Sequence, residues 1–179
     1  MVGPGGRGGA DRGGETHVDL VRLGPDDWQE FRTVRLASLA DAPAAFGARY
    51  DDWVDAQEQQ WRDRLVAVPL TMVARCDGAP VGVACGAPVS RGDGMELISM
   101  WVAPEHRGTG LAHRLIEHVV AWAAESGHST CLTVREDNEA AIRTYARAGF
   151  QDRGVPADHS PDAPRERLMV RPLRGSASI

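Results

Sequence analysis

The chain has 179 residues, of which 42% are hydrophobic and 25% are charged, the composition of a globular protein of single-domain size. A formal charge of −5 and a pI of about 5.7 argue against a nucleic-acid partner, and no apolar run approaches the length that spans a membrane. We therefore expect no nucleic-acid and no membrane partner, and cytoplasmic location is the default.

The cysteines Cys76, Cys85 and Cys131 are scattered along the chain and odd in number. They match neither a disulfide framework nor the spacing of metal ligands, so all three are expected to be small, buried apolar residues. Three histidines of the central segment also match no metal motif, and no metal is predicted. These histidines are His106, His113 and His118.

Residues 1–14 are rich in glycine, polar and without periodicity. Such a segment cannot bury enough surface to offset its ordering entropy, so it is predicted to be a disordered leader. The expected organisation is this leader, one domain over residues 15–174 and a short tail over residues 175–179.

The first part of the domain predicts a strand followed by two helices. Alternation over Thr16–Leu23 indicates the strand. Gly24-Pro25-Asp26-Asp27 begins a helix that ends near Pro43, because proline suits the first turn and acidic side chains favour the positive end. A second helix is predicted over about Asp51–Leu65. The inward side chains of the first helix are Trp28, Phe31 and Leu39, and the second helix bears Trp53, Gln57 and Trp61.

A hairpin and a strand–loop–helix unit follow. Leu70–Cys76 and Pro80–Val89 are joined by Asp77-Gly78, a strong signal for a hairpin turn. The apolar run Met95–Val102 reads as a strand, which Pro104 ends because proline cannot donate to a ladder. The helix after it has apolar residues at spacings of four and three, on one face. These residues are Leu111, Leu115, Val119 and Trp122.

The loop of this unit is suited to hold a phosphate or diphosphate. Gly108 and Gly110 allow positive φ and close approach of a ligand, and the first turn of the helix presents unpaired N–H groups. Arg107 adds a permanent positive charge. A tight turn alone would also explain the two glycines. The loop lacks the Gly-Lys-Ser/Thr of a nucleotide P-loop, and His113 stands where a dinucleotide fingerprint requires glycine.

The remaining elements alternate between strands and a helix. The predicted segments are a strand over Thr130–Val134, a helix over Glu139–Ala148 with Asn138 at its N-cap, a short strand over Phe150–Arg153, a loop over Gly154–Pro164 and a final strand over Arg167–Arg171.

Two of these segments resemble the cofactor motifs of the GNAT N-acetyltransferase superfamily. Arg107-x-x-Gly110-x-Ala112, preceded by Val102-x-Pro104, is similar to its acyl-CoA motif, and Asn138–Phe150, with its tyrosine and its Gly-Phe end, is similar to its second motif. The strong resemblance covers Met95–Phe150. It implies a mixed α/β (α+β) fold with a mostly antiparallel central sheet of about seven strands and helices on both faces.

The resemblance also implies an activity and a cofactor site. Acetyl-CoA is the implied cosubstrate, and its acetyl group passes to a primary amine by direct attack in a ternary complex. The strand before the loop would part from the next strand, leaving backbone groups to bind the pantetheine arm and polarise the thioester, while loop amides hold the diphosphate. The implied cofactor residues are Met100, Trp101, Val102, Arg107, Gly108, Thr109, Gly110, Leu111, Ala112, Asn138, Ala141 and Arg143.

Two side chains are candidates for proton transfer. Tyr145 lies two helical turns beyond Asn138 and could donate a proton to the departing sulfur, although a packed tyrosine with a satisfied hydroxyl is the alternative. Glu96 lies on the strand whose residues 96, 98, 100 and 102 are expected to share one face, and it could act as the base. The alternative is that Glu96 is simply an exposed residue at the start of the strand.

The need for a base depends on the acceptor. Presenting a lysine-like amine in its neutral form at pH 7 costs about 4.6 kcal/mol, whereas an α-amino group costs only about 1.4 kcal/mol. The acceptor is expected to be a small-molecule or peptide amine. Acidic residues in the segments that line the acceptor site in this superfamily suggest a cationic acceptor, and ordinary solvated acids are the alternative. These residues are Asp41, Asp51, Asp52, Asp55, Asp152, Asp158 and Asp162.

A second class of function also fits the resemblance. A catalytically weak acyl-CoA-binding module could keep the cofactor pocket and act as a sensor. The presence of Tyr145 and Glu96 favours the enzyme. The resemblance leaves a homodimer open, because dimers are common in the superfamily but no feature of this sequence shows one.

Overall fold

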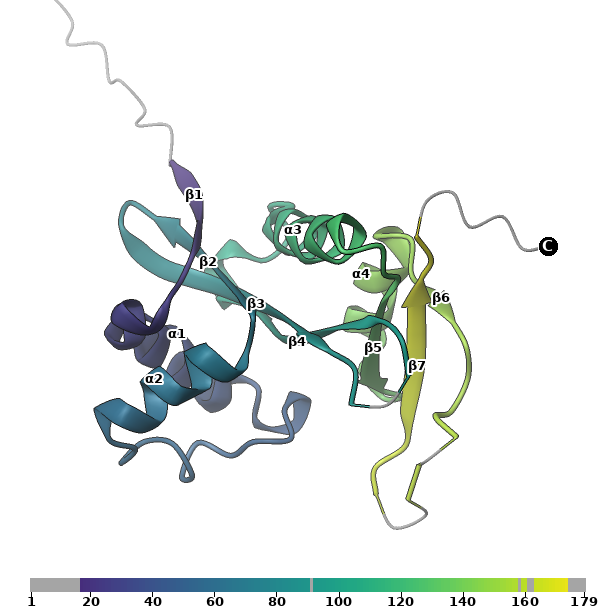
Figure 1. Ribbon diagram of the computed structural model, residues 1–179, viewed down its shortest axis with the longest axis horizontal. Helices are drawn as coiled ribbons and strands as arrows, with labels where there is room; N and C mark the ends of the chain where they lie inside the picture. Colours follow the sequence, from purple (N-terminus) through teal and green to yellow (C-terminus); the bar gives the residue numbers. More distant parts are fainter. Residues whose placement is uncertain (1–16, 91, 158, 161–162, 174–179) are drawn as a thin grey trace, which may run out of the picture.

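The computed structural model describes residues 17–90, 92–157, 159–160 and 163–173. The predicted leader, residues 1–14, and the predicted tail, residues 175–179, lie outside this range. Figure 1 shows the elements, which in chain order are β1 (Val18–Arg22), the 3-10 turn η1 (Pro25–Asp27), α1 (Trp28–Asp41), the 3-10 turn η2 (Pro43–Ala45), α2 (Glu58–Ala67), β2 (Leu70–Cys76), β3 (Ala79–Pro88), β4 (Met95–Val102), the 3-10 turn η3 (Pro104–His106), α3 (Leu111–Glu125), β5 (Thr130–Arg135), α4 (Glu139–Arg147), β6 (Gln151–Asp152) and β7 (Glu166–Arg171).

The strands form one seven-stranded sheet in the order β1-β2-β3-β4-β5-β7-β6. All neighbouring pairs are antiparallel except β4 and β5, which are parallel. In Figure 1 α1 and α2 cover one face of the sheet and α3 covers the other. The expected mixed, mostly antiparallel sheet of about seven strands with helices on both faces is therefore confirmed.

β4 and β5 pair only at their first residues. Met95 lies opposite Thr130 and Glu96 lies opposite Cys131, and no later residue of β4 has a partner in β5. β4 keeps its pairing with β3 as far as Val102. From Leu97 onward β4 therefore leaves one edge of its backbone unpaired within the sheet, which creates the gap that positions the site.

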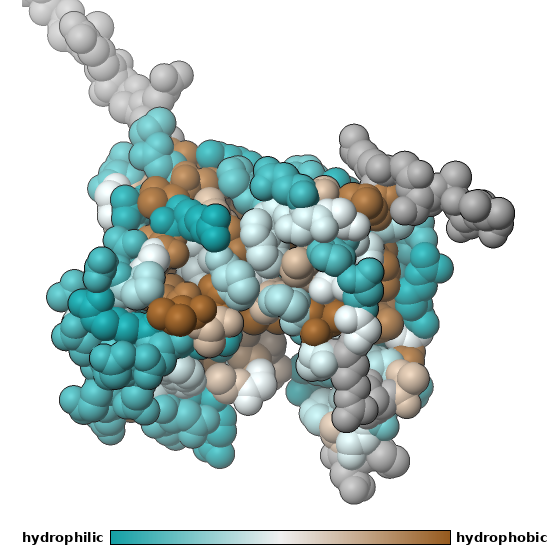
Figure 2. Space-filling model, in the orientation of Figure 1, coloured by the Kyte–Doolittle hydropathy of each residue, from teal (hydrophilic) through white to brown (hydrophobic). Residues whose placement is uncertain are grey.

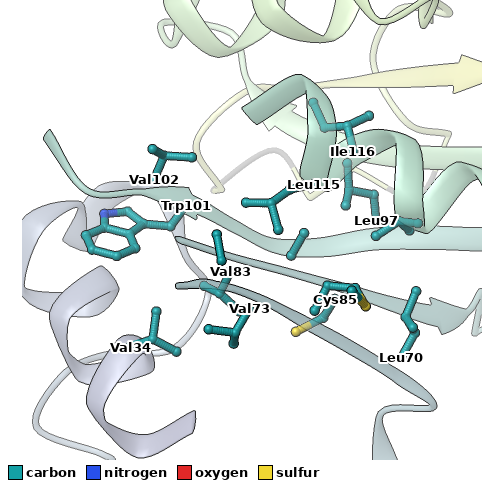
Figure 3. Packing of buried hydrophobic residues seen from close by; sticks show 14 of the residues in the cluster. Val34, Leu70, Val73, Val83, Cys85, Leu97, Trp101, Val102, Leu115 and Ile116 are labelled. Atoms are coloured by element: carbon teal, nitrogen blue, oxygen red, sulfur yellow. The ribbon is translucent and has the colours of Figure 1, made fainter. Parts of the chain in front are cut away.

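A bulge near Ser99 rotates the second half of β4. The register with β3 shifts between Val83 and Cys85, and Ser99 has a φ of 56°, which is rare for a residue other than glycine. Figure 3 shows the result, since Val102 points toward Leu115 and Trp101 points to the opposite side of the sheet. Glu96 and Ile98 share one face, but the expectation that Val102 continues it is wrong, because the extra residue reverses the alternation.

The core lies on both sides of the central strands. Phe31 and Leu39 of α1 are buried as predicted, whereas Trp28 is only partly buried. On the other face Leu111, Leu115 and Val119 of α3 are buried. Trp122 of α3 packs over Gly86, where an added Cβ would meet the indole ring at 2.8 Å. Glycine at this position therefore permits α3 to lie close to β3.

The second helix begins later than the sequence suggested. α2 starts at Glu58 rather than Asp51, because the Gln60 side chain accepts a hydrogen bond from the Gln57 amide at 2.8 Å and caps the helix there. Trp53 lies in the preceding turn and packs on Trp61, with ring centroids 4.7 Å apart. The two tryptophans therefore pack together although only Trp61 lies in the helix, and the prediction that both belong to one helix is wrong.

Candidate functional site

Two adjacent cavities lie along β4 and share part of their lining. The loop cavity, of about 800 Å³, extends over the end of β4, the glycine loop, the start of α3 and one face of α4. The sheet cavity, of about 640 Å³, lies against the first half of β4, β5 and the segment after α1. Figure 2 shows a hollow between the α1–α2 side of the molecule and the β5–β7 side. The residues common to both cavities are Ala45, Phe46, Met100, Asn138, Ala141 and Tyr145.

The glycine loop gives the loop cavity a backbone wall. Gly108 and Gly110 have φ values of 77° and 86°, in the region that glycine alone adopts without strain. Apart from the glycine and its two chain neighbours, no heavy atom lies within 4 Å of a Cβ built on either residue, so both face open space. Gly110 is the N-cap of α3, and the amides of the first helical turn point outward beside it. This arrangement fits the diphosphate of a coenzyme A thioester.

Most of the predicted cofactor residues meet on the loop cavity. Its wall includes Met100, Trp101, Val102, Arg107, Gly108, Gly110, Ala112, Asn138 and Ala141. Three predicted side chains lie elsewhere. The Thr109 hydroxyl donates to the His106 carbonyl at 2.7 Å, and the Leu111 side chain is buried in the core. Arg143 pairs with Glu139 at 3.1 Å on the exposed face of α4.

The sequence did not single out several other residues of this wall. Ala140, Thr144 and Arg147 lie on the same face of α4, and their spacings of four and three would have indicated that face. Within the described residues, the Arg147 side chain has neither a hydrogen bond nor an ion pair, unlike Arg143. The other unpredicted members of the wall are Ala42, Ala45, Phe46, His106 and His113.

Asp41 joins the end of α1 to the end of β4 and the glycine loop. Trp101 Nε1 donates to Asp41 Oδ2 at 2.8 Å, and the Arg107 guanidinium donates to the same oxygen. The hydrogen bond from Trp101, and then the interaction with Arg107, hold the pKa of Asp41 below its usual value. Arg107 Nε also donates to the Val102 carbonyl at 2.9 Å. Arg107 therefore braces the loop in addition to bringing positive charge.

Tyr145 stands where the two cavities meet. Its ring contacts Phe150 edge to face at a centroid distance of 5.9 Å, and burial raises the pKa of the phenol to about 12. No described residue makes a hydrogen bond with its hydroxyl. Asn138, on the same helix, caps α4 by accepting a hydrogen bond from the Ala141 amide at 3.1 Å. The phenol is thus protonated at neutral pH and available to a ligand.

Glu96 lines the sheet cavity together with Tyr145. Its side chain is partly buried, and burial, followed by the negative charge of Glu166, raises its pKa above the ordinary value. Cys131, its partner across β4 and β5, has a raised thiol pKa from burial and from the charge of Glu96. A carboxylate with a raised pKa is a better proton acceptor than an exposed one, which suits a general base.

The described acidic residues of the predicted rim do not line either cavity. Asp41 is held as described above, Asp51 lies 3.9 Å from Arg49, and Asp152 pairs with Arg167 at 2.6 Å. Asp52 and Asp55 also lie outside both walls. Asp158 and Asp162 lie outside the described residues. The charged side chains on the wall of the sheet cavity are Arg35, Arg64, Glu96, Arg135 and Glu166.

Residues 29–150 match the model of the acetyltransferase (GNAT) family. An uncharacterized N-acetyltransferase of Mycobacterium bovis is 38% identical over 87 residues, which cover 47% of this chain and 54% of that protein. A protein of Azospirillum brasilense named IAA acetyltransferase is 34% identical over 103 residues, which cover 57% of this chain and 67% of that protein. The chain thus spans about half the length of the mycobacterial relative.

Solved structures share the fold at lower sequence identity. A GNAT-family acetyltransferase of Streptococcus pneumoniae has a TM-score of 0.71 and 19% identity over 88% of this chain and 100% of that chain. The Salmonella typhimurium protein yncA, solved with its cofactor acetyl-CoA, has a TM-score of 0.66 and 18% identity over 92% of this chain and 98% of that chain. Because the family model matches more than half of the sequence, the chain belongs to the GNAT acetyltransferase family.

Proposed function

We propose that this protein transfers the acetyl group of acetyl-CoA to a primary amine while both substrates are bound. The observation that carries the proposal is the position of Tyr145, which lines both cavities beside the unpaired edge of β4. Acetyl-CoA occupies the loop cavity, and the amine enters from the sheet cavity. The thioester and the amine then meet beside the phenol.

The chain binds the cosubstrate mainly through its backbone. Amides between Arg107 and Ala112 hold the diphosphate, with the N-terminus of α3 adding a favourable dipole. The pantetheine arm follows the unpaired edge of β4, and an amide from the Met100–Val102 segment polarises the thioester carbonyl. The Val102 carbonyl already accepts a hydrogen bond from Arg107, which fixes this segment. Binding of both substrates in one orientation supplies much of the rate.

The transfer requires two protons to move. The amine nitrogen attacks the carbonyl carbon of the thioester, and Glu96 accepts the proton that the nitrogen loses. The carbon–sulfur bond then breaks, and the sulfur leaves with the electron pair and receives the phenolic proton of Tyr145. The products are an acetylated amine and the thiol of coenzyme A. Return of the proton from Glu96 to the phenolate through solvent restores both side chains.

Tyr145 and Glu96 have pKa values that suit these roles. Burial raises the pKa of Tyr145 to about 12, so the phenol keeps its proton until the sulfur gains charge. The raised pKa of Glu96 makes it a stronger base than an ordinary carboxylate. A lysine-like amine nevertheless remains far more basic, with a pKa of roughly 10.4, so an amine of lower pKa is the easier acceptor.

A screen for thiol release tests the function directly. Purified protein is incubated with acetyl-CoA and a library of amines, and the free thiol and the acetylated product are both quantified. Equal amounts of thiol and acetylated amine with at least one class of acceptor support the proposal. Binding of acetyl-CoA without thiol release above the buffer rate, for every amine, would contradict it and favour the sensor.

A further inference from the structure

Apart from Arg135, which pairs with Asp137 at 2.5 Å, the charges on the sheet cavity fall into two groups. Arg35 of α1 and Arg64 of α2 lie on one part of its wall, and Glu96 of β4 and Glu166 of β7 lie on another. The two glutamates influence each other electrostatically, as do the two arginines. Neither arginine forms an ion pair with any described residue. The cavity therefore has a cationic end and an acidic end.

No carboxylate among the described residues pairs with the cationic end. Arg35 is only 6% exposed, and its Nη1 atom has no hydrogen-bond partner among the described residues. Its guanidinium lies over the Phe46 ring at 4.7 Å from the centroid. Burial is the main cause that lowers the pKa of Arg35 to about 10, and the positive charge of Arg64 acts in the same direction. A buried cation without a counter-ion is unfavourable, and an anionic ligand would relieve it.

The register of the sheet indicates that the strand residues beside the two ends lie close together. Cys85, which interacts electrostatically with both arginines, lies opposite Ile98 in the β3–β4 pair. Ile98 and Glu96 are two residues apart on the same face of β4, before the bulge. Two residues of antiparallel strand span about 7 Å. Both ends also line one cavity of about 640 Å³, so a single small molecule can contact both.

We propose that the amine acceptor also carries a carboxylate, which binds at Arg35 and Arg64 while the amine points toward Glu96 and Tyr145. The acceptor is thus an amino acid or a similar amino carboxylate. This inference rests on the proposed acetyl transfer and names its substrate class. It replaces the cationic acceptor that the acid-rich segments suggest, because none of the described acids of those segments lines the cavity, whereas Arg35 and Arg64 do.

An α-amino acid also fits the chemistry of the acidic end. Its amino group has a lower pKa than a lysine side chain, so less free energy is needed to present it in the neutral form. The carboxylate would be held by guanidinium groups, which can donate two parallel hydrogen bonds to it. The arginines at one end of the cavity would thus position the acceptor, and Glu96 at the other end would remove the proton from its amine.

The test compares each L-α-amino acid with its own α-amide as the acceptor. We expect kcat/KM to be at least about tenfold higher for the best amino acid than for its amide, which keeps the amine and removes the charge. Arg64→Gln should reduce that ratio to about twofold or less, chiefly by raising KM for the amino acid. The control is Arg62→Gln on the same helix, because Arg62 is already paired with Glu58 and Asp26 and lies outside both cavities. This variant should keep the wild-type ratio.

A second variant separates recognition from a structural role. Arg35→Met should lose the preference for amino acids while its melting temperature stays equal or rises, because the change removes a buried charge that has no counter-ion. A purely structural arginine would instead lower the melting temperature and reduce activity equally for amino acids and amides. That result for Arg35→Met, together with an unchanged ratio in Arg64→Gln, overturns the proposal.

The outcomes distinguish this inference from the proposed function. Efficient acetylation of amides, equal to that of the amino acids, leaves acetyl transfer in place and overturns the carboxylate site. If no amine is acetylated, the proposed function fails, and binding decides the carboxylate site. In that case amino acids must raise the melting temperature of the coenzyme A-saturated wild type but not of Arg64→Gln. No rise with any amino acid overturns the site.

Discussion

The loop cavity and the sheet cavity are built in different ways. The loop cavity is formed largely by two short segments, Met100–His113 and Asn138–Arg147, and the contacts proposed for acetyl-CoA are mostly with backbone amides and one helix N-terminus. The sheet cavity gathers side chains from α1, α2, β4, β5, β7 and the segment after α1. A backbone site of this kind leaves a recognisable pattern in the sequence. A side-chain site assembled by the fold leaves almost none.

The difference predicts which property each change should affect. Changes in the loop cavity should weaken acetyl-CoA binding whatever the acceptor. Changes in the sheet cavity should alter the choice of acceptor and spare the cosubstrate. A change at Tyr145, where the cavities meet, should affect turnover and neither binding step.

The largest effect is expected for Tyr145→Phe. Removing the phenolic hydroxyl should lower kcat by about 100-fold or more, because general acid catalysis contributes roughly 10²–10⁴ in rate. The affinity for acetyl-CoA should stay within about twofold of the wild type, since the ring still packs on Phe150. Steady-state kinetics and a binding titration measure the two effects separately.

The control for this change is Tyr50→Phe, the same substitution at the other tyrosine of the chain, which is exposed and outside both cavities. It should leave kcat unchanged. Wild-type turnover in Tyr145→Phe would show that another group, or water, protonates the sulfur.

Gly110→Glu should disrupt the proposed binding of the acetyl-CoA diphosphate in the loop cavity. A carboxylate beside the diphosphate adds repulsion of several kcal/mol, so the affinity for acetyl-CoA should fall by about 100-fold. Gly127→Glu is the matched control, because Gly127 also has a positive φ, of 78°, and open space around its Cβ position. Calorimetric titration should find normal affinity in the control. An equal loss in both variants would attribute the effect to backbone strain.

Arg147→Ala should raise KM for acetyl-CoA by about tenfold at low salt, because Arg147 lies on the loop cavity, has no partner in the described part of the chain and can bind a phosphate group. Arg143→Ala, one helical turn earlier and paired with Glu139, should change KM by less than about twofold. Kinetics at two salt concentrations measure the difference. A larger increase in KM for Arg143→Ala than for Arg147→Ala would indicate that Arg143 binds the phosphate, as the sequence predicts.

The smallest effect is expected in the pH profile of Glu166→Gln. The negative charge of Glu166 contributes to the raised pKa of Glu96, so its removal should lower that pKa. In the proposed mechanism activity requires ionised Glu96, so it should be lost as the pH falls through the pKa of this carboxyl group. The acidic limb of kcat/KM should therefore move to lower pH in Glu166→Gln. Glu139→Gln, outside both cavities, should leave the limb in place, and an unmoved limb in Glu166→Gln would argue against Glu96 as the base.

Local patterns predicted most of the fold. The hairpin turn at Asp77-Gly78, the helix cap at Asn138 and the apolar face of α3 are each encoded by residues close together in sequence, and the structure confirms them. The predicted start of α2 was wrong because Trp53 and Trp61 pack together across a turn and do not lie in one helix. The predicted orientation of the side chains along β4 was wrong because a bulge at Ser99 has no sequence signature when glycine is absent.

Only part of the candidate site could be predicted from the sequence. The glycine loop and the tyrosine helix could be identified, because backbone binding requires particular residues at fixed spacing. Arg35 and Arg64 could not, since one lies in α1 and the other in α2 and only the fold brings them to one cavity. Asp41 was assigned to an acidic rim, whereas its bonds to Trp101 and Arg107 appear only in three dimensions.

Isothermal titration calorimetry of acetyl-CoA into the purified wild-type protein tests the central claim most directly. The claim is that the amides of the glycine loop and the unpaired edge of β4 hold a coenzyme A thioester in the loop cavity. One-site binding is predicted, with coenzyme A competing for the same site. No detectable heat with either acetyl-CoA or coenzyme A, at several temperatures, would contradict it.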